Sequence, residues 1–304
     1  MAINAETSAA AIRFQNYFHL VGISFLIWDH ILTFGRECRF FWNRRKSTTS
    51  TFLFFILRYG ALGTNIPVLV FSFVTLPTKT VCLNYDLVHQ CFMLLTQVGV
   101  SVVMILRIYS LYSRSPRILW SLIGIAVVLM GLTIWAVLKG QRGFAMTVLP
   151  GCHLAIFESG SYHLAIPWVA LFVFDSVIFG LTIHCAYATR RSMGPNADLP
   201  IHRLLVRDGA MYFGATALAN LANIFTFFVT GPTAPGSLAT SATCMSVTMM
   251  TRLMLNLHER TENTDSVFSV SDLRDPSRAS AYGGELEFAL GTDSQASRAS
   301  QVVP

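Results

Sequence analysis

A series of long apolar segments constrains the fold of this chain more than any other feature. A helix needs roughly 18 or more apolar residues to cross a hydrocarbon layer of about 30 Å. Seven runs meet this length: residues 14–34, 51–76, 87–109, 118–138, 164–189, 210–230 and 238–257. Lipid cannot satisfy the hydrogen-bonding groups of an open strand, so each run should be helical. The sequence therefore predicts an all-α integral membrane bundle of seven transmembrane helices.

The composition agrees with a chain that is surrounded by a lipid bilayer. Only 12% of the 304 residues are charged, about half the share in soluble domains. The formal net charge of +6 would suit an acidic partner, but the basic residues lie in short loops between apolar runs, where orientation signals occur. We therefore expect the bilayer, and no nucleic acid, as a partner.

The loop charges predict which way the bundle faces. Basic residues are concentrated in three alternate loops, between runs one and two, three and four, and five and six. By the positive-inside rule these loops are cytoplasmic, which places the N-terminus outside and the C-terminus in the cytoplasm. We expect the plasma membrane in preference to an internal one.

The composition changes after residue 257. Residues 258–304 are rich in serine, charged residues and glycine and cannot bury enough apolar surface to fold alone. The chain therefore divides into a transmembrane domain, residues 1–257, and a disordered cytoplasmic tail, residues 258–304. Serines near arginines in the tail are candidates for phosphorylation, although a solvated tail with incidental serines explains them equally well.

Two charged residues lie inside the first two runs. Asp29 is five residues before the end of the first run, and Arg58 is seven residues after the start of the second. At a rise of about 1.5 Å per residue, both lie roughly 8–10 Å into the membrane from the same side. Isolated charges at that depth are costly and tend to pair. We therefore predict an intramembrane ion pair between Asp29 and Arg58.

Two cysteines are expected on the outer face, where the environment is oxidising. Cys82 precedes the third run, and Cys152 lies in the loop between the fourth and fifth. A disulfide between them would close a loop of about 70 residues and stabilise the fold by roughly 4 kcal/mol. The alternative is two unpaired thiols.

Other polar residues have structural and functional interpretations. Asp175 in the fifth run could bind a cationic ligand or a proton, or form a structural hydrogen bond to Asn220 or Asn223, which are three residues apart on the sixth run. Asp208 is expected to cap the N-terminus of the sixth helix.

No pattern in the sequence indicates catalysis or a cofactor. The eight histidines form no H-x-x-x-H or H-E-x-x-H pair. The seventh run has no lysine to hold retinal, and no serine lies in a nucleophile motif. We expect no metal and no cofactor, and we favour a protein without enzymatic activity over an enzyme.

Several segments together resemble a known family. The run WDHILTFGRECRFFWNRRKSTTSTFLFFILRYG (28–60) combines an aspartate-bearing span, an Arg-Glu turn and a Leu/Phe-rich run that ends in Arg-Tyr. Further likeness lies in LRIYSLYSRSP (106–116), GCHL (151–154), FDSVIFGLT (174–182), LLVRDGAMYF (204–213) and RLMLNLHE (252–259). This pattern is similar to the fungal membrane proteins grouped as a domain of unknown function, DUF6533. The resemblance implies a multispan membrane protein and no catalytic residues.

Three functions remain open on the sequence. The span count, the predicted disulfide and the serine-rich tail favour a receptor-like or sensor-like protein with a cytoplasmic signalling partner, which is an analogy of architecture. A transporter or membrane-embedded enzyme acting on a lipid or small molecule is the second hypothesis, with Asp29, Arg58 and Asp175 in its site. A structural scaffold is the third.

Overall fold

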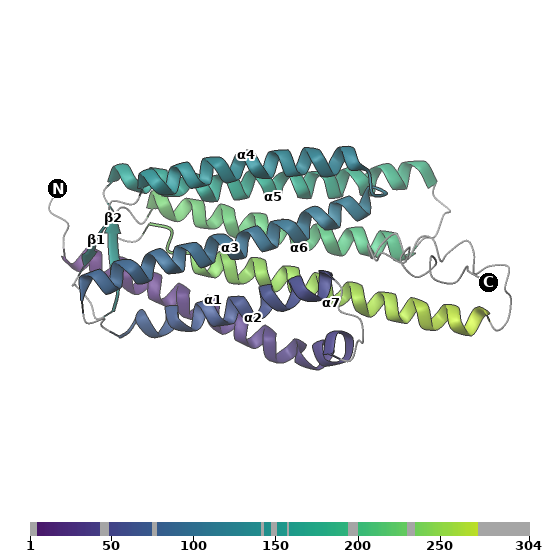
Figure 1. Cartoon of the computed structure of the whole chain (residues 1–304), viewed down its shortest axis with the longest axis horizontal. Coiled ribbons are helices and arrows are strands. Elements are labelled where there is room, and N and C mark those ends of the chain that lie inside the picture. The colour runs from purple at the N-terminus through teal and green to yellow at the C-terminus, as the bar shows by residue number, and fades with distance from the viewer. Residues whose placement is uncertain are drawn as a thin grey trace, which may run out of the picture.

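The computed structural model of this chain is an elongated helical bundle (Figure 1). It describes residues 5–42, 49–74, 78–140, 143–146, 151–156, 158–193, 200–229 and 235–272. The helices run roughly along the long axis of the molecule, and a small two-stranded sheet lies at one end. This end is called the hairpin end below.

The predicted seven helices are present and extend beyond most of the apolar runs. They are α1 (Ala5–Glu37), α2 (Thr49–Phe71), α3 (Lys79–Leu111), α4 (Pro116–Gly140), α5 (Glu158–Met193), α6 (Pro200–Val229) and α7 (Ala239–Asp272). A single π-helical turn, η1 (Cys38–Trp42), continues α1. The strands β1 (Gly143–Met146) and β2 (His153–Ile156) pair antiparallel in the loop between α4 and α5.

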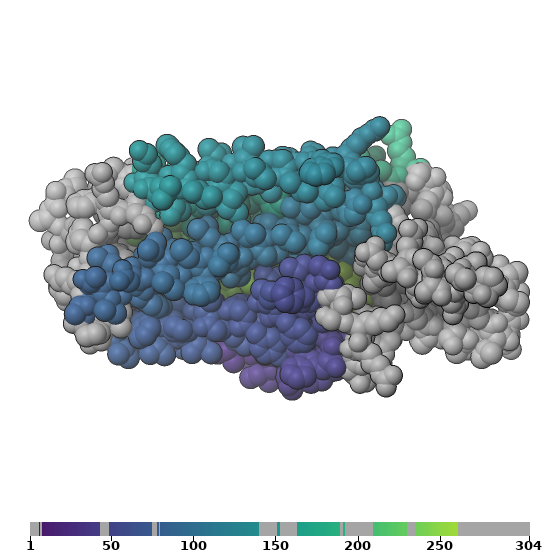
Figure 2. All heavy atoms as spheres, viewed as in Figure 1, coloured from purple at the N-terminus to yellow at the C-terminus, as the bar shows by residue number. Residues whose placement is uncertain are grey.

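Six of the helices, α1 to α6, are long and apolar enough to cross a membrane within the part of the chain that the structure describes. Their outward faces carry large apolar side chains such as Trp120 and Val127 on α4 and Leu218 on α6, each more than half exposed. Figure 2 shows α4, α3 and α2 side by side on one face of the bundle. A surface of this kind suits lipid and would be unusual for a soluble monomer, so the chain is a multi-pass membrane protein.

Helix α7 is different, because it lies inside the bundle. It packs against α1, α2, α3 and α6, and side chains on every side of it are buried. Many of these are serines and threonines, which make the helix too polar for the hydropathy criterion that the other six satisfy. Their hydroxyl groups donate to the backbone of the same helix, as Thr243 does to Ala239 O and Ser246 to Ala242 O, both at 2.9 Å. A polar helix is thereby accommodated in an apolar bundle.

The described part of the chain enters and leaves the bundle at opposite ends. Helix α1 begins at the hairpin end, and α7 ends at the opposite end (Figure 1). The helix α7 does not stop at the predicted domain boundary but continues past Leu257 to Asp272. His258 continues the packing there, with its ring 4.5 Å from that of Phe41. Residues 273–304 of the predicted tail lie outside the described residues.

Candidate functional site

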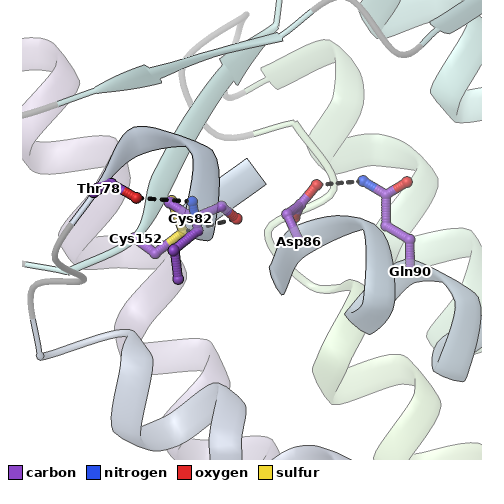
Figure 3. The surroundings of a disulfide bond; sticks show 6 residues. Thr78, Cys82, Asp86, Gln90 and Cys152 are labelled. Atoms are coloured by element: carbon purple, nitrogen blue, oxygen red, sulfur yellow. Dashed lines mark hydrogen bonds between the residues drawn. A yellow bond between two sulfur atoms is a disulfide. The ribbon is translucent and has the colours of Figure 1, made fainter. Parts of the chain in front are cut away.

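Cys82 and Cys152 form a disulfide at the hairpin end (Figure 3). Cys82 lies in the first turn of α3, where the side chain of Thr78 caps the helix by accepting from the backbone N–H of Val81 at 3.3 Å. The backbone N–H of Cys152 also donates to Phe71 O at the end of α2, at 3.0 Å. The segment that leads into β2 is thus attached to both α2 and α3.

A cavity of about 420 Å³ lies between the helices next to this disulfide. All seven helices contribute to its wall, together with Cys152 and the turn before α7. Representative lining residues from different elements are His19, Ser72, Asp86, Trp168, Phe227 and Thr240. The volume is within the range of about 300–1,000 Å³ that is usual for small-molecule sites.

The wall of the cavity contains hydrogen-bonding groups that the protein leaves unused. The buried hydroxyl of Tyr85 and the Nε2 atom of His89 have no hydrogen-bond partner among the described residues. Asp86 accepts a hydrogen bond from the Nε2 amide of Gln90 at 2.7 Å (Figure 3). Buried polar groups usually have partners, so Tyr85 and His89 are exceptions among the residues that line this cavity.

The sequence analysis did not identify this cavity. A signal was present in the fourfold spacing of Cys82, Asp86 and Gln90, which places them on one face of α3. Because Cys82 is joined to Cys152, that face must lie under the hairpin. Asp86 was the informative residue, since it is an acid near the beginning of an apolar helix.

An apolar core closes the cavity on the side away from the hairpin. Along α3 and α7 the cavity-lining residues Gln97 and Thr240 are followed by core residues such as Met104, Val247 and Met250. The Nε2 amide of Gln97 donates to Thr243 Oγ1 at 3.2 Å and joins the two helices at this level.

The far half of the bundle contains a buried ionic cluster built around Arg58 of α2. Its Nε atom lies 2.7 Å from Oε2 of Glu37, at the end of α1, and both side chains are almost fully buried. Glu37 Oε1 accepts from the hydroxyl of Tyr59 at 2.7 Å and from the indole N–H of Trp42 at 3.0 Å. The carboxylate thus has partners on α2 and on the π-helical turn.

The predicted direct pair between Asp29 and Arg58 is wrong. Asp29 pairs with Nε of Arg252 on α7, and Arg58 pairs with Glu37. The two pairs are linked through Thr33, whose hydroxyl donates to Asp29 O and accepts from Arg58 Nη2, both at 2.7 Å. The prediction failed because α1 continues three residues beyond the apolar run and carries Glu37 into the core.

A second, more exposed set of contacts continues this network. The Nη1 atom of Arg36 donates to Asn256 Oδ1 at 3.1 Å and lies 3.5 Å from Glu259. The Nδ2 amide of Asn256 donates to the hydroxyl of Tyr212 at 2.7 Å. The end of α1 is thereby connected to both α7 and α6.

The polar group on α5 and α6 is partly as expected. The Nδ2 amide of Asn220 donates to Asp175 Oδ2 at 2.7 Å, and both side chains are buried. Asn223 does not bond to Asp175; its Oδ1 atom instead accepts from Thr226 Oγ1 at 3.4 Å. The first pair therefore has the structural arrangement of the two that the sequence left open.

The predicted capping role of Asp208 is wrong. Helix α6 begins at Pro200, so Asp208 lies more than two turns inside the helix. A capping residue must precede the free N–H groups of the first turn. The apolar run began later than the helix because polar residues fill its first turns.

Comparison with protein families gives one match. Residues 17–63 match a family model described as "Family of unknown function (DUF6533)". Neither the curated proteins nor the solved structures gave a match. The matched segment runs from α1 through η1 into α2 and includes Asp29, Glu37 and Arg58. Residues 17–63 of this chain are thus similar to the DUF6533 family of unknown function.

Proposed function

We propose that this protein is a receptor-like or sensor-like membrane protein that binds a small molecule in the cavity at the hairpin end. It crosses the plasma membrane seven times, with its N-terminus outside and its C-terminus in the cytoplasm, and acts on a cytoplasmic signalling partner. One observation carries the proposal: the cavity lies between the helices, is attached to a disulfide-linked hairpin, and is lined by residues with buried hydrogen-bonding groups that have no partner among the described residues.

The seventh crossing is supported by the position of α7. This helix lies among α1, α2, α3 and α6 and runs from the cavity to the far end of the bundle. The hydroxyls of Thr243, Ser246 and Thr251 donate to the backbone of α7 itself, so lipid need not solvate them. Helix α1 begins at the hairpin end and α7 finishes at the far end, which is consistent with an odd number of crossings.

Signal transfer is supported by three helices that reach from the cavity to the buried ion pairs. Helices α1, α2 and α7 each contribute to the cavity, through His19, Val68 and Thr240. The same three helices carry the two ion pairs at the far end. A ligand that changes the spacing of these helices at the cavity would therefore act on the ion pairs and could break them.

The closed inner side of the cavity distinguishes this proposal from transport. A transporter should expose its site to each side in turn, commonly through broken helices. Here an apolar core containing Met104 and Met250 lies beyond the cavity. We therefore favour ligand sensing over ligand passage.

The test begins with the purified protein and a chemically diverse small-molecule library, screened by thermal unfolding. A ligand at 100 times its dissociation constant should stabilise the protein by about 2.7 kcal/mol. Met93→Trp, which fills the cavity, should abolish the shift. The matched control is Leu95→Trp on the same helix, because Leu95 is 65% exposed and faces away from the cavity.

Transmission is tested by alkylation of Cys38, a half-buried thiol of η1 beside the ionic cluster. In a Cys91→Ser, Cys185→Ser background, a ligand found by the screen should change the rate of Cys38 modification. A ligand that leaves this rate unchanged, or that crosses liposomes containing the protein, would reject sensing. Epitope tags on the two termini, detected from one side at a time, test the orientation.

A further inference from the structure

We infer that the cavity binds a small organic cation, an amine attached to an aromatic or apolar group, with the Asp86 carboxylate as its counter-ion. This inference rests on the proposed function, since it names the class of ligand for the same cavity. It is carried by the charge of the wall, the aromatic groups beside Asp86 and the unused hydrogen-bonding groups.

The charge of the wall favours a cation. Among the described residues of the wall, Asp86 is the only acidic side chain, and none is a lysine or an arginine. A carboxylate in a poorly solvated site is costly unless an opposite charge pairs with it. The bound cation would provide this charge, whereas a carboxylate or phosphate ligand would find no permanent positive partner.

The position of Asp86 leaves it available to a ligand. Its Oδ2 atom accepts from Gln90, the residue one turn further along α3 (Figure 3). Its Oδ1 atom has no hydrogen bond to any residue that the structure describes. Gln90 therefore orients the carboxylate without neutralising it, and one oxygen remains for an ammonium N–H.

Aromatic residues line the same cavity as the Asp86 carboxylate. The ring of Tyr85, the residue before Asp86, contacts that of Phe71 edge-on, with 4.8 Å between centroids. Trp168 and Phe227 contribute further aromatic surface from α5 and α6. Aromatic faces attract cations by about 0.5–2 kcal/mol and also bury the apolar part of a ligand. A carboxylate among aromatic rings is thus chemically suited to an amine with an apolar body.

The unused groups indicate where the rest of the ligand makes contact. The hydroxyl of Tyr85 and Nε2 of His89 are buried without partners among the described residues, one turn apart on α3. A rotation of either side chain would present its polar atom to a hydroxyl or carbonyl on the ligand. The volume of about 420 Å³ limits the ligand to a small molecule and excludes a lipid with two full acyl chains.

The inference is tested with three probes of similar shape and different charge: 2-phenylethylamine, 2-phenylethanol and 3-phenylpropanoate. Binding to the intact, disulfide-bonded protein in nanodiscs is measured by calorimetry and by thermal unfolding. The amine should bind at least about tenfold more tightly than the alcohol, which corresponds to one charge-assisted contact. The propanoate should bind more weakly than the alcohol.

Asp86→Asn is the decisive variant, because asparagine has nearly the same shape and can still accept from Gln90. It should remove the preference for the amine over the alcohol while leaving the affinity for the alcohol within about twofold. The melting temperature of the ligand-free variant shows whether it folds. Phe92→Leu, a change on the exposed side of the same helix, is the control and should leave all three affinities unchanged.

The outcomes separate the ligand class from the proposed function. Equal or tighter binding of the alcohol or the propanoate, or an amine preference that survives Asp86→Asn, would overturn the cationic assignment and leave a cavity that binds another class. Failure of all three probes to bind at about 10 mM would also overturn it. The library screen with Met93→Trp judges the proposed function independently.

Discussion

Arg58 reaches Glu37 at the end of α1, and does not reach Asp29 two turns earlier on the same helix. The two side chains lie 2.7 Å apart and are 2% and 0% exposed. The Glu37–Arg58 pair joins α1 to α2, and the Asp29–Arg252 pair joins α1 to α7. Helix α1 is thus held to two helices by two separate charges.

The pairing predicts a specific pattern of coupling. Arg58→Met should destabilise the protein by about 3–5 kcal/mol, because it leaves Glu37 as a buried charge without a partner. Adding Glu37→Gln should recover part of this loss, with a coupling energy of about 0.5–3 kcal/mol in a double-mutant cycle. Thermal unfolding in detergent measures the effect.

The control cycle combines Arg58→Met with Asp29→Asn. These residues are linked only through Thr33, so the coupling energy should be smaller than for Glu37. A larger coupling with Asp29 would show that the pairing described above is incorrect.

Arg252 should be less sensitive than Arg58. Its side chain is 35% exposed, whereas that of Arg58 is 2% exposed. Arg252→Met should therefore lower the melting temperature by less than Arg58→Met, because the place vacated by the exposed part of Arg252 admits water beside Asp29, although Asp29 itself is only 3% exposed. An equal or greater loss would indicate that the α1–α7 pair is the stronger one.

Gly22 should not tolerate a side chain. A methyl group there would lie 2.7 Å from the Cα atom of Ser241 on α7, and backbone cannot move aside easily. Gly22→Ala should destabilise by about 1–3 kcal/mol through overpacking.

Gly60 provides the matched control, because a methyl group there would meet nothing within 4 Å. Gly60→Ala should be neutral or stabilise α2 by about 0.5–1 kcal/mol, as alanine is the better helix former. Thermal unfolding of the two variants under the same conditions should give shifts of opposite sign. A neutral Gly22→Ala would reject the close contact of α1 and α7.

Loss of the disulfide should lower the free energy of unfolding. Cys82→Ser, Cys152→Ser and the double variant should each lower the free energy of unfolding by the same amount, up to about 4 kcal/mol in the chain-entropy model. Cys91→Ser, at an exposed thiol, should have no such effect. A single variant much milder than the double variant would contradict a bond between the two cysteines.

The seven helices could be predicted because run length and hydropathy report directly on lipid. The residues that pair inside the bundle could not, because pairing depends on where each helix ends. Glu37 looked like a loop residue since the apolar run stops at Phe34, yet the helix continues to it. The number of charges inside the runs pointed to a second acid. Arg58 and Arg252 are two bases within the runs and each requires an acidic partner, so Asp29 alone is not enough for both.

The cavity was harder to anticipate for a different reason. It is formed by residues of all seven helices, and their spacing in sequence carries no information about which helices are neighbours. Only the α3 face that includes Cys82, Asp86 and Gln90 could be recognised, once the disulfide fixed its direction. Asp208 was misplaced for the reason that applies to Glu37, because polar turns begin α6 before the apolar run.

The enclosure of α7 has a consequence for biogenesis in the proposed topology. A segment so rich in serine and threonine partitions poorly into lipid when it leaves the translocon alone. In this topology α1 to α6 must assemble first and surround α7, so the insertion of α7 is a late step that depends on their assembly. A substitution that disrupts α1 or α2 would then leave the C-terminus on the outer side of the membrane, before any loss of ligand binding could be measured.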